Sequence, residues 1–213
     1  MAVIFILGDS WGTRDGLPPH YRKDNPHLEQ HLESAGHVVH NYSRCAGRNS
    51  ESMDRALKHL DLRPDYIIWF HTESLRDFMP KQRFRIWEST VEHARANYLQ
   101  FKKLLDANHA KDIIIGGQAP VLRDLLVHDP YYIIEDWRCE LLNIPSIVTH
   151  SVCHTYLFKH KKCDDSKEER LRMLEQNEVI IDAEKKHPWF PDNCHPGAEA
   201  HLALFERISK LLC

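Results

Sequence analysis

The sequence lacks long hydrophobic runs, and its start does not have the pattern typical of export. The first apolar stretch, Ala2–Leu7, is six residues long and has no basic residue before it. A signal peptide needs a positively charged start and an apolar segment of about 7–15 residues, and a membrane-spanning helix needs about 20 residues. We therefore interpret Ala2–Leu7 as a buried strand, and we expect a cytoplasmic protein without membrane insertion.

An excess of charge of one sign is also absent. The chain has 28 Lys and Arg against 31 Asp and Glu, and no basic run stands apart from acidic neighbours. Nucleic-acid binding usually requires a basic patch, so the sequence offers no electrostatic basis for such a partner. With 42% hydrophobic and 28% charged residues, the composition is that of an ordinary globular protein. The length suits one domain, residues 1–213, and leaves the oligomeric state open.

Closely spaced cysteine pairs are missing as well. The six cysteines are widely spaced and include no C-x-x-C pair: Cys45, Cys139, Cys153, Cys163, Cys194 and Cys213. This spacing, without an export signal, favours reduced thiols over a disulfide framework.

Histidine, by contrast, is abundant, with sixteen residues. Two pairs have the i,i+4 spacing that would place both imidazoles on one helix face, His27 with His31 and His150 with His154. Neither pair has the Glu of the H-E-x-x-H zinc motif. We therefore expect no metal ion and no other cofactor.

Short apolar runs alternate with longer amphipathic stretches along the chain. The runs are short, several are β-branched, and turn or charged residues flank them: Ala2–Leu7, Val38–Tyr42, Tyr66–Phe70, Ile113–Ile115 and Ile144–Val148. Such runs are typical of strands that are buried on both faces. Alternation of strands and helices predicts a mostly parallel, five-stranded sheet with helices on both sides, whose sites gather at the carboxyl ends of the strands.

The intervening stretches predict helices with recognisable ends. One runs from Pro26 to Ala35 and ends at Gly36, and another runs from Ser50 to Leu60, with Asn49 or Ser50 as its N-cap. Two more have apolar residues at steps of three and four, and we expect these residues to face the core: Phe84, Trp87, Val91, Ala94, Tyr98, Phe101 and Leu105 in 83–105, and Leu204, Phe205, Ile208 and Leu212 in 197–212. The charged segment 159–170 predicts a solvated loop or the exposed start of a helix.

The first predicted strand leads directly into Gly8-Asp9-Ser10-Trp11-Gly12. A serine at this place lies at the rim of a parallel sheet, where substrates bind, and the two glycines allow a tight turn. The motif is equally compatible with an ordinary turn that ends a strand.

A second motif, Asp192-Asn193-Cys194-His195-Pro196, precedes the last predicted helix. A serine hydroxyl needs an imidazole to take its proton, and the imidazole needs a carboxylate to orient it. Asp192 can reach His195 within the same loop. Taken alone, the pair is better explained by an N-capping Asp beside an incidental histidine.

Together the two motifs resemble the SGNH (GDSL-like) hydrolase family, which carries its nucleophile in a first block and its Asp and His in a last block. The resemblance covers nearly the whole chain. It implies a three-layer, flavodoxin-like fold and a metal-free serine esterase in which Ser10, His195 and Asp192 are catalytic. It also implies an oxyanion hole that includes the backbone N–H groups of Ser10 and Gly47.

The third block of the family departs from its pattern in this chain. A Gly-x-Asn-Asp is expected there, but the sequence has His71-Thr72-Glu73-Ser74, so Glu73 stands where an Asn would donate to the oxyanion. An ionised Glu has no donor. Three explanations stay open. Glu73 is protonated, another donor such as Asn49, Gln118, Thr72 or His71 replaces it, or the site binds without turnover.

Other residues of the same sheet edge are candidates for substrate binding. We expect them to line the site: Asp9, Trp11, Asn49, His71 and Gln118. Arg44, Arg48 and Arg76 lie in the neighbouring predicted loops, where each could bind an anionic group or form an ordinary ion pair.

These residues predict a serine esterase or deacylase for an acyl ester of a small molecule or glycan. An acyltransferase is a close variant, because an alcohol can capture the same acyl-enzyme. The alternative is a binding protein on the same scaffold with weak or no hydrolysis, since fold does not guarantee chemistry.

Overall fold

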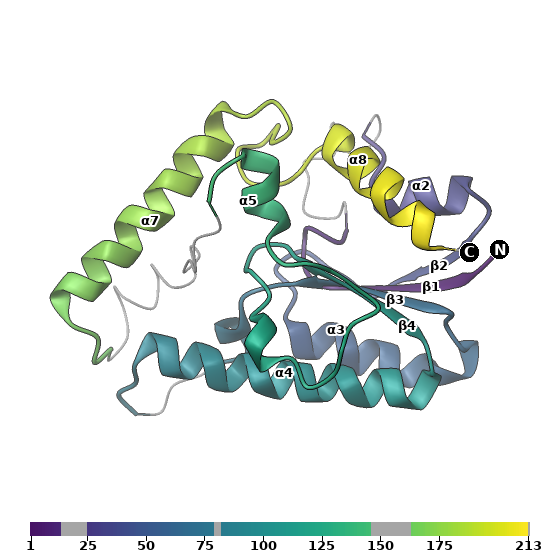
Figure 1. Cartoon of the computed structure of the whole chain (residues 1–213), viewed down its shortest axis with the longest axis horizontal. Coiled ribbons are helices and arrows are strands. Elements are labelled where there is room, and N and C mark those ends of the chain that lie inside the picture. The colour runs from purple at the N-terminus through teal and green to yellow at the C-terminus, as the bar shows by residue number, and fades with distance from the viewer. Residues whose placement is uncertain (14–24, 79–81, 146–162, 213) are drawn as a thin grey trace.

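The computed structural model describes residues 1–13, 25–78, 82–145 and 163–212. Its helices and strands follow one another in alternation (Figure 1): β1 Val3–Leu7, α2 Leu28–Ser34, β2 Val38–Asn41, α3 Asn49–Ala56, η2 Leu57–Leu62, β3 Tyr66–His71, η3 Ser74–Asp77, α4 Ile86–Asn108, β4 Lys111–Gly116, η4 Arg123–Leu125, β5 Tyr132–Ile134, α5 Trp137–Leu142, α7 Lys167–Lys186, α8 Ala198–Ile208 and η5 Ser209–Leu211.

The five strands form one parallel sheet in the order β2-β1-β3-β4-β5. The central strand β3 is buried along its whole length, which explains its unbroken apolar run from Tyr66 to Phe70. The order places β1 in the interior of the sheet, so the segment that follows Leu7 emerges beside the end of β3. The predicted fold class, an α/β protein with a mostly parallel five-stranded sheet, is confirmed.

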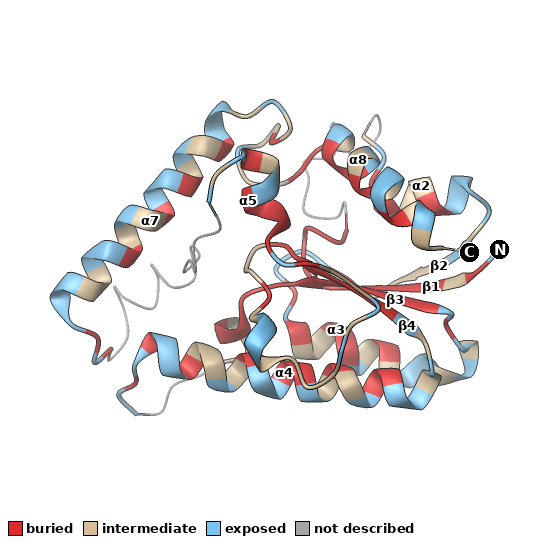
Figure 2. Ribbon diagram, in the orientation of Figure 1, coloured by how far each residue is buried: buried red, intermediate tan, exposed pale blue. Residues whose placement is uncertain are grey.

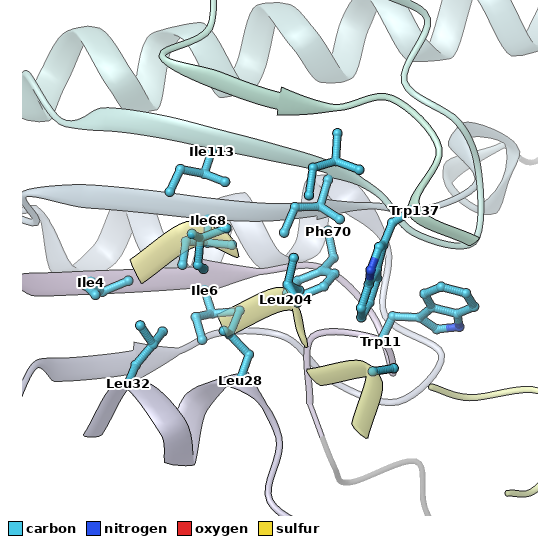
Figure 3. Close-up of a cluster of buried hydrophobic side chains, with 14 of the residues drawn as sticks. Ile4, Ile6, Trp11, Leu28, Leu32, Ile68, Phe70, Ile113, Trp137 and Leu204 are labelled. Atoms are coloured by element: carbon cyan, nitrogen blue, oxygen red, sulfur yellow. The ribbon is translucent and has the colours of Figure 1, made fainter. Parts of the chain in front are cut away.

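Helices cover both faces of the sheet, so the chain forms three layers (Figure 1). On one face, α3 and α4 pack against β1 and β3 through residues that include Met53, Tyr98 and Phe101. On the other face, α2, α5 and α8 enclose the core drawn in Figure 3, where Leu28, Trp137 and Leu204 meet side chains of the sheet. Alternate residues of each strand serve the two cores.

The predicted strand 144–148 is wrong at Ile144, and its residues 146–148 lie outside the described ranges. The fifth strand is Tyr132–Ile134, which is too short to stand out as an apolar run. Ile144 instead follows the C-terminus of α5, where its N–H donates to Cys139 O across 3.1 Å after left-handed Asn143. Its apolar side chain packs against the core, as is typical after such a helix end.

Two helix predictions also need correction. Arg48 is the N-cap of α3, without a side-chain hydrogen bond, because Asn49 turns its side chain toward β3 instead. In α4, Trp87 is exposed and Val91 is only partly buried, while Ala94, Tyr98, Phe101 and Leu105 face the core as predicted.

Residues 159–162 of the expected solvated segment 159–170 lie outside the described ranges, and the part from 163 to 170 is not solvated throughout. Cys163 and Asp165 are buried, and Phe84 pairs with Cys163 in a bridge instead of belonging to α4. The helix that follows, α7, begins after Ser166, whose hydroxyl accepts from Glu169 N. Its outer side is exposed in Figure 2.

Within the described ranges, no helix is long and apolar enough to cross a membrane. The cytoplasmic location stays a prediction.

Candidate active site

Ser10 lies in a tight turn at the carboxyl end of β1. Gly8 adopts a φ of +137°, and a Cβ there would come within 2.7 Å of Phe70 O on β3, so a side chain cannot fit. The Asp9 carboxylate accepts from Trp11 N at 3.0 Å, and Gly12 N donates to Asp9 O at 3.1 Å. These bonds hold Ser10 at the rim of the sheet, where the residue is only 4% exposed.

Asp192 organises the loop before α8. Its Oδ1 accepts from the backbone N–H groups of Cys194 at 3.0 Å and His195 at 2.7 Å. Its Oδ2 lies 2.6 Å from His195 Nδ1. Because an ionised carboxylate only accepts, this contact assigns the Nδ1 proton to the imidazole and leaves Nε2 as an acceptor.

The two ends of the chain meet at this point. His195 Nε2 lies 2.9 Å from Ser10 Oγ, so Ser10, His195 and Asp192 form one continuous line of hydrogen bonds. This is the arrangement in which an imidazole can take a serine proton and a carboxylate can stabilise the resulting charge.

Electrostatics favour an ionised Asp192. Burial alone would raise its pKa, but the hydrogen bonds from His195 and the backbone outweigh this effect, and the pKa is lowered. The neighbouring Cys194 behaves in the opposite way. Burial, with the charges of Glu184 and Asp192 nearby, raises the pKa of its thiol to about 11. Cys194 is therefore a neutral thiol at physiological pH and does not compete with Ser10 as a nucleophile.

A buried ion pair that the sequence analysis did not predict supports this site. Arg138 of α5 donates through Nε to Glu184 of α7 at 2.8 Å, and their side chains are only 9% and 2% exposed. The Arg138 guanidinium also lies 6.0 Å from the Trp11 ring. A sequence signal existed for Glu184, because it continues the buried stripe of α7 that includes Asn177 and Ile180 at helical spacing.

Most of the predicted substrate-binding residues are buried. Asp9, Trp11, Asn49 and His71 are buried, and among the five predicted residues Gln118 alone is partly exposed. Trp11 is wholly buried, so its predicted contact with substrate is not supported in this conformation.

The packing around these buried residues explains their positions. The Trp11 ring stacks edge-to-face on Trp137, 5.7 Å between centroids. His71 Nδ1 lies 3.3 Å from Ala119 O, and burial lowers the pKa of His71 to about 4. His71 is therefore a neutral, structural imidazole at the end of β3.

Asn49 is tied to the end of the third strand. Its Nδ2 donates to Thr72 O at 2.8 Å, while its Oδ1 accepts from Thr72 N at 3.1 Å and from Trp69 Nε1 at 3.2 Å. Its amide thus fixes the strand end and is not aimed at a substrate.

Gly47 lies against the Ser10 turn, since a Cβ on it would come within 3.0 Å of Gly8 O. In this conformation its N–H donates to Arg44 O at 2.9 Å. Glu73 is buried, and Arg76 forms an ion pair with it at 3.6 Å. Of the three arginines near the site, Arg44 and Arg48 are exposed, and Arg44 is paired with Glu51.

In the described ranges no group of three or more His, Cys, Asp or Glu residues could hold a metal ion. His27 stacks on His201 with ring centroids 4.0 Å apart, and His31 stacks on Phe205. The pair His150/His154 lies outside the described residues, as do Cys153 and Cys213. Of the described cysteines, Cys45, Cys163 and Cys194 are free thiols, and Cys139 is buried.

No family model and no curated protein matches the sequence. Among solved structures, TesA aligns at 13% identity over 99% of this chain and 97% of that chain, with a TM-score of 0.51. The esterase EstA from Pseudoalteromonas sp. aligns at 16% identity over 99% and 96%, with a TM-score of 0.46. A lipase/acylhydrolase from Enterococcus faecalis aligns at 12% identity over 100% and 95%, with a TM-score of 0.44. The chain has the three-layer α/β/α fold of the SGNH hydrolases, the family that its terminal motifs resemble.

Proposed function

We propose that the protein is a serine-dependent ester hydrolase. The observation that carries this proposal is the contact of His195 Nε2 with Ser10 Oγ at 2.9 Å, continued by Asp192 at 2.6 Å. A packing or capping role for these residues would not require this order of hydroxyl, imidazole and carboxylate across 185 positions of sequence.

The proposed reaction has two halves. Ser10 Oγ attacks the acyl carbon while His195 Nε2 takes its proton, and the imidazolium then protonates the leaving alcohol. In the second half, His195 Nε2 takes a proton from a water molecule, which attacks the acyl-enzyme. The acid then leaves, and the proton returns to Ser10 Oγ. Asp192 keeps the Nδ1 proton in place and stabilises the transient positive charge, consistent with its lowered pKa.

We propose an acyl ester of a small molecule or glycan as the substrate class. The acyltransferase variant differs only in the acceptor, because an alcohol takes the place of water.

Hydrolysis of p-nitrophenyl acetate and butyrate tests the proposal. Wild type, Ser10→Ala and His195→Gln are compared from pH 5 to 9. Turnover that rises as an imidazole loses its proton, and that disappears in both variants, is expected. Equal background rates in all three proteins would refute hydrolysis of simple esters.

A binding protein on the same scaffold is the second candidate, and Glu73 favours it. This residue stands where a donor to the oxyanion is needed, and its buried carboxylate can only accept when ionised. Covalent labelling with a serine-directed phosphonate separates the two functions. An activated Ser10 attacks phosphorus and expels the leaving group of the phosphonate, so the protein gains the mass of the phosphonyl group, whereas a binding protein gives no more labelling than Ser10→Ala.

A further inference from the structure

Arg76 lies between the segments that surround Ser10. It belongs to η3, directly after β3, and its side chain is 14% exposed. Nη1 donates to Gly47 O at 3.2 Å and lies 3.4 Å from Asp9 Oδ2, while Nε lies 3.6 Å from Glu73 Oε2. Nη2 donates to the side-chain oxygen of Gln118. One guanidinium therefore connects the loops that follow β1, β2, β3 and β4.

Three of the other groups considered as oxyanion donors are engaged elsewhere. The Asn49 amide donates to Thr72 O, the Thr72 hydroxyl donates to Asp9 Oδ2 at 2.7 Å, and Gly47 N–H donates to Arg44 O. Glu73 stands where the resembled family carries its donating amide, and an ionised carboxylate has no proton to donate. Without a compensating cation, Ser10 would react through a transition state that its surroundings destabilise.

The charges around Arg76 favour a role in the transition state over binding of an anionic substrate. Arg76 already lies within ion-pair distance of Asp9 and Glu73, so its charge is not left over for a substrate that is anionic from the start. A neutral ester meets no such penalty. Its oxygen becomes negative only during the reaction, when an adjacent guanidinium stabilises it most.

Gln118 indicates how a substrate reaches the guanidinium. Its amide carbonyl is chemically close to an ester carbonyl, and it contacts Nη2 of Arg76. Gln118 is also partly exposed, unlike Asp9 and Glu73, so it can move aside at low cost.

We propose that Arg76 stabilises the oxyanion in place of the amide that Glu73 replaces, with the substrate carbonyl displacing Gln118 from Nη2. This inference rests on the proposed function. When the bond from Ser10 Oγ to the acyl carbon forms, the carbonyl π pair moves onto its oxygen beside Arg76, and the serine proton passes to His195. When the carbonyl re-forms, the bond to the alcohol breaks, and the alcohol leaves with that proton. Glu73 and Asp9 hold the guanidinium in position.

The test uses turnover of p-nitrophenyl butyrate and inhibition by butylboronic acid, which forms a tetrahedral adduct with an active serine. In Arg76→Gln, kcat is expected to fall on the order of 10²–10³. The boronic acid should bind correspondingly more weakly, with KM changed by only a few-fold. Arg123→Ala is the matched control, because Arg123 is an exposed arginine paired with Glu135. Its kcat should equal that of the wild type.

Two double variants separate this role from a structural one. Glu73→Asn with Arg76→Gln removes the unpaired charge and supplies an amide donor, so kcat should recover at least tenfold over Arg76→Gln. Glu73→Met with Arg76→Gln removes the charge without supplying a donor, so kcat should stay low. Equal recovery of kcat in the two double variants, or an unchanged kcat in Arg76→Gln alone, would overturn the inference.

If Arg76→Gln does not fold, Arg76→Lys replaces it in the comparison. Lys lacks the fork of donors that Arg has, so kcat should still fall. An unchanged kcat in Arg76→Lys would overturn the inference. Failure of the proposed function can be distinguished from failure of this inference. If the proposed function is wrong, the wild type itself neither turns over esters nor reacts with the phosphonate.

Discussion

Acidification is expected to destabilise the protein through His71, and substitution of this residue by Gln tests the reasoning. His71 ends β3 with only 2% exposure. Its Nδ1 contacts Ala119 O, so this nitrogen carries the proton of the neutral ring. Nε2 is buried without a hydrogen-bond partner among the described residues, beside the rings of Trp69 and Tyr98. A second proton on Nε2 would thus create a buried charge that water cannot reach.

The magnitude follows from the lowered pKa. Burial outweighs the hydrogen bonds to the backbone and lowers the pKa of His71 from 6.5 to about 4. Below pH 6.5 the unfolded chain therefore binds a proton that the folded chain refuses, and stability falls as the pH falls. At about 1.4 kcal/mol per pH unit, the loss at pH 5 is about 2 kcal/mol, and it levels off near pH 4.

Urea unfolding of wild type and His71→Gln at pH 7.5, 6.5, 5.5 and 5.0 measures this contribution. The variant keeps a donor for Ala119 O but does not titrate. The difference in free energy of unfolding between the two proteins should change by about 2 kcal/mol in favour of the variant from pH 7.5 to 5.0. His201, whose pKa burial lowers well below 6.5, acts equally in both proteins and cancels. A difference that is the same at all four pH values, with equal denaturant slopes, would refute the reasoning.

Three further predictions concern buried groups. Asn49→Ala leaves the buried N–H and C=O of Thr72 without their partner, so urea unfolding should show a loss of about 2–4 kcal/mol. An unchanged midpoint would contradict the proposed bonds. Arg138→Met leaves Glu184 buried and unpaired and should cost about 3–5 kcal/mol, most of which Arg138→Met with Glu184→Leu should recover. A double variant no more stable than the single one would show that the charge is not the cause. Gly8→Ala places a Cβ within 2.7 Å of a strand carbonyl at a φ of +137°, so thermal melting should show severe destabilisation, and a wild-type midpoint would contradict this packing.

The sheet and its helices could be predicted because their signals are local. β1 and β3 are apolar throughout, since both of their faces are buried, and α4 repeats apolar residues at the helical period. β5 escaped prediction because three residues form no pattern of their own. Its position depends on pairing with β4, which is a long-range contact.

The parts of the candidate site that come from the first and last motifs of the chain could be predicted, and the parts contributed by the segments between them could not. The strand end before Ser10 and the helix start after His195 are local features, and a parallel sheet brings such ends to one edge. The spacing of α7 places Glu184 on the buried side of the helix, but its pairing with Arg138 could not be predicted because it depends on how α5 packs against α7. Glu73 was recognised as unusual, but its partner was not.

The sequence by itself determined the alternation of buried strands and amphipathic helices, and with it the parallel sheet and the edge at which Ser10 and His195 should lie. Tertiary structure alone decided that Trp11 and His71 are packed away from solvent, that the Asn49 amide bonds to the backbone at the end of β3, and that Arg76 pairs with Glu73. The physical reason is the range of the interactions. Hydrophobic period and turn chemistry act between near neighbours in the chain, whereas burial, ion pairing and pKa depend on side chains that only the completed fold brings into contact.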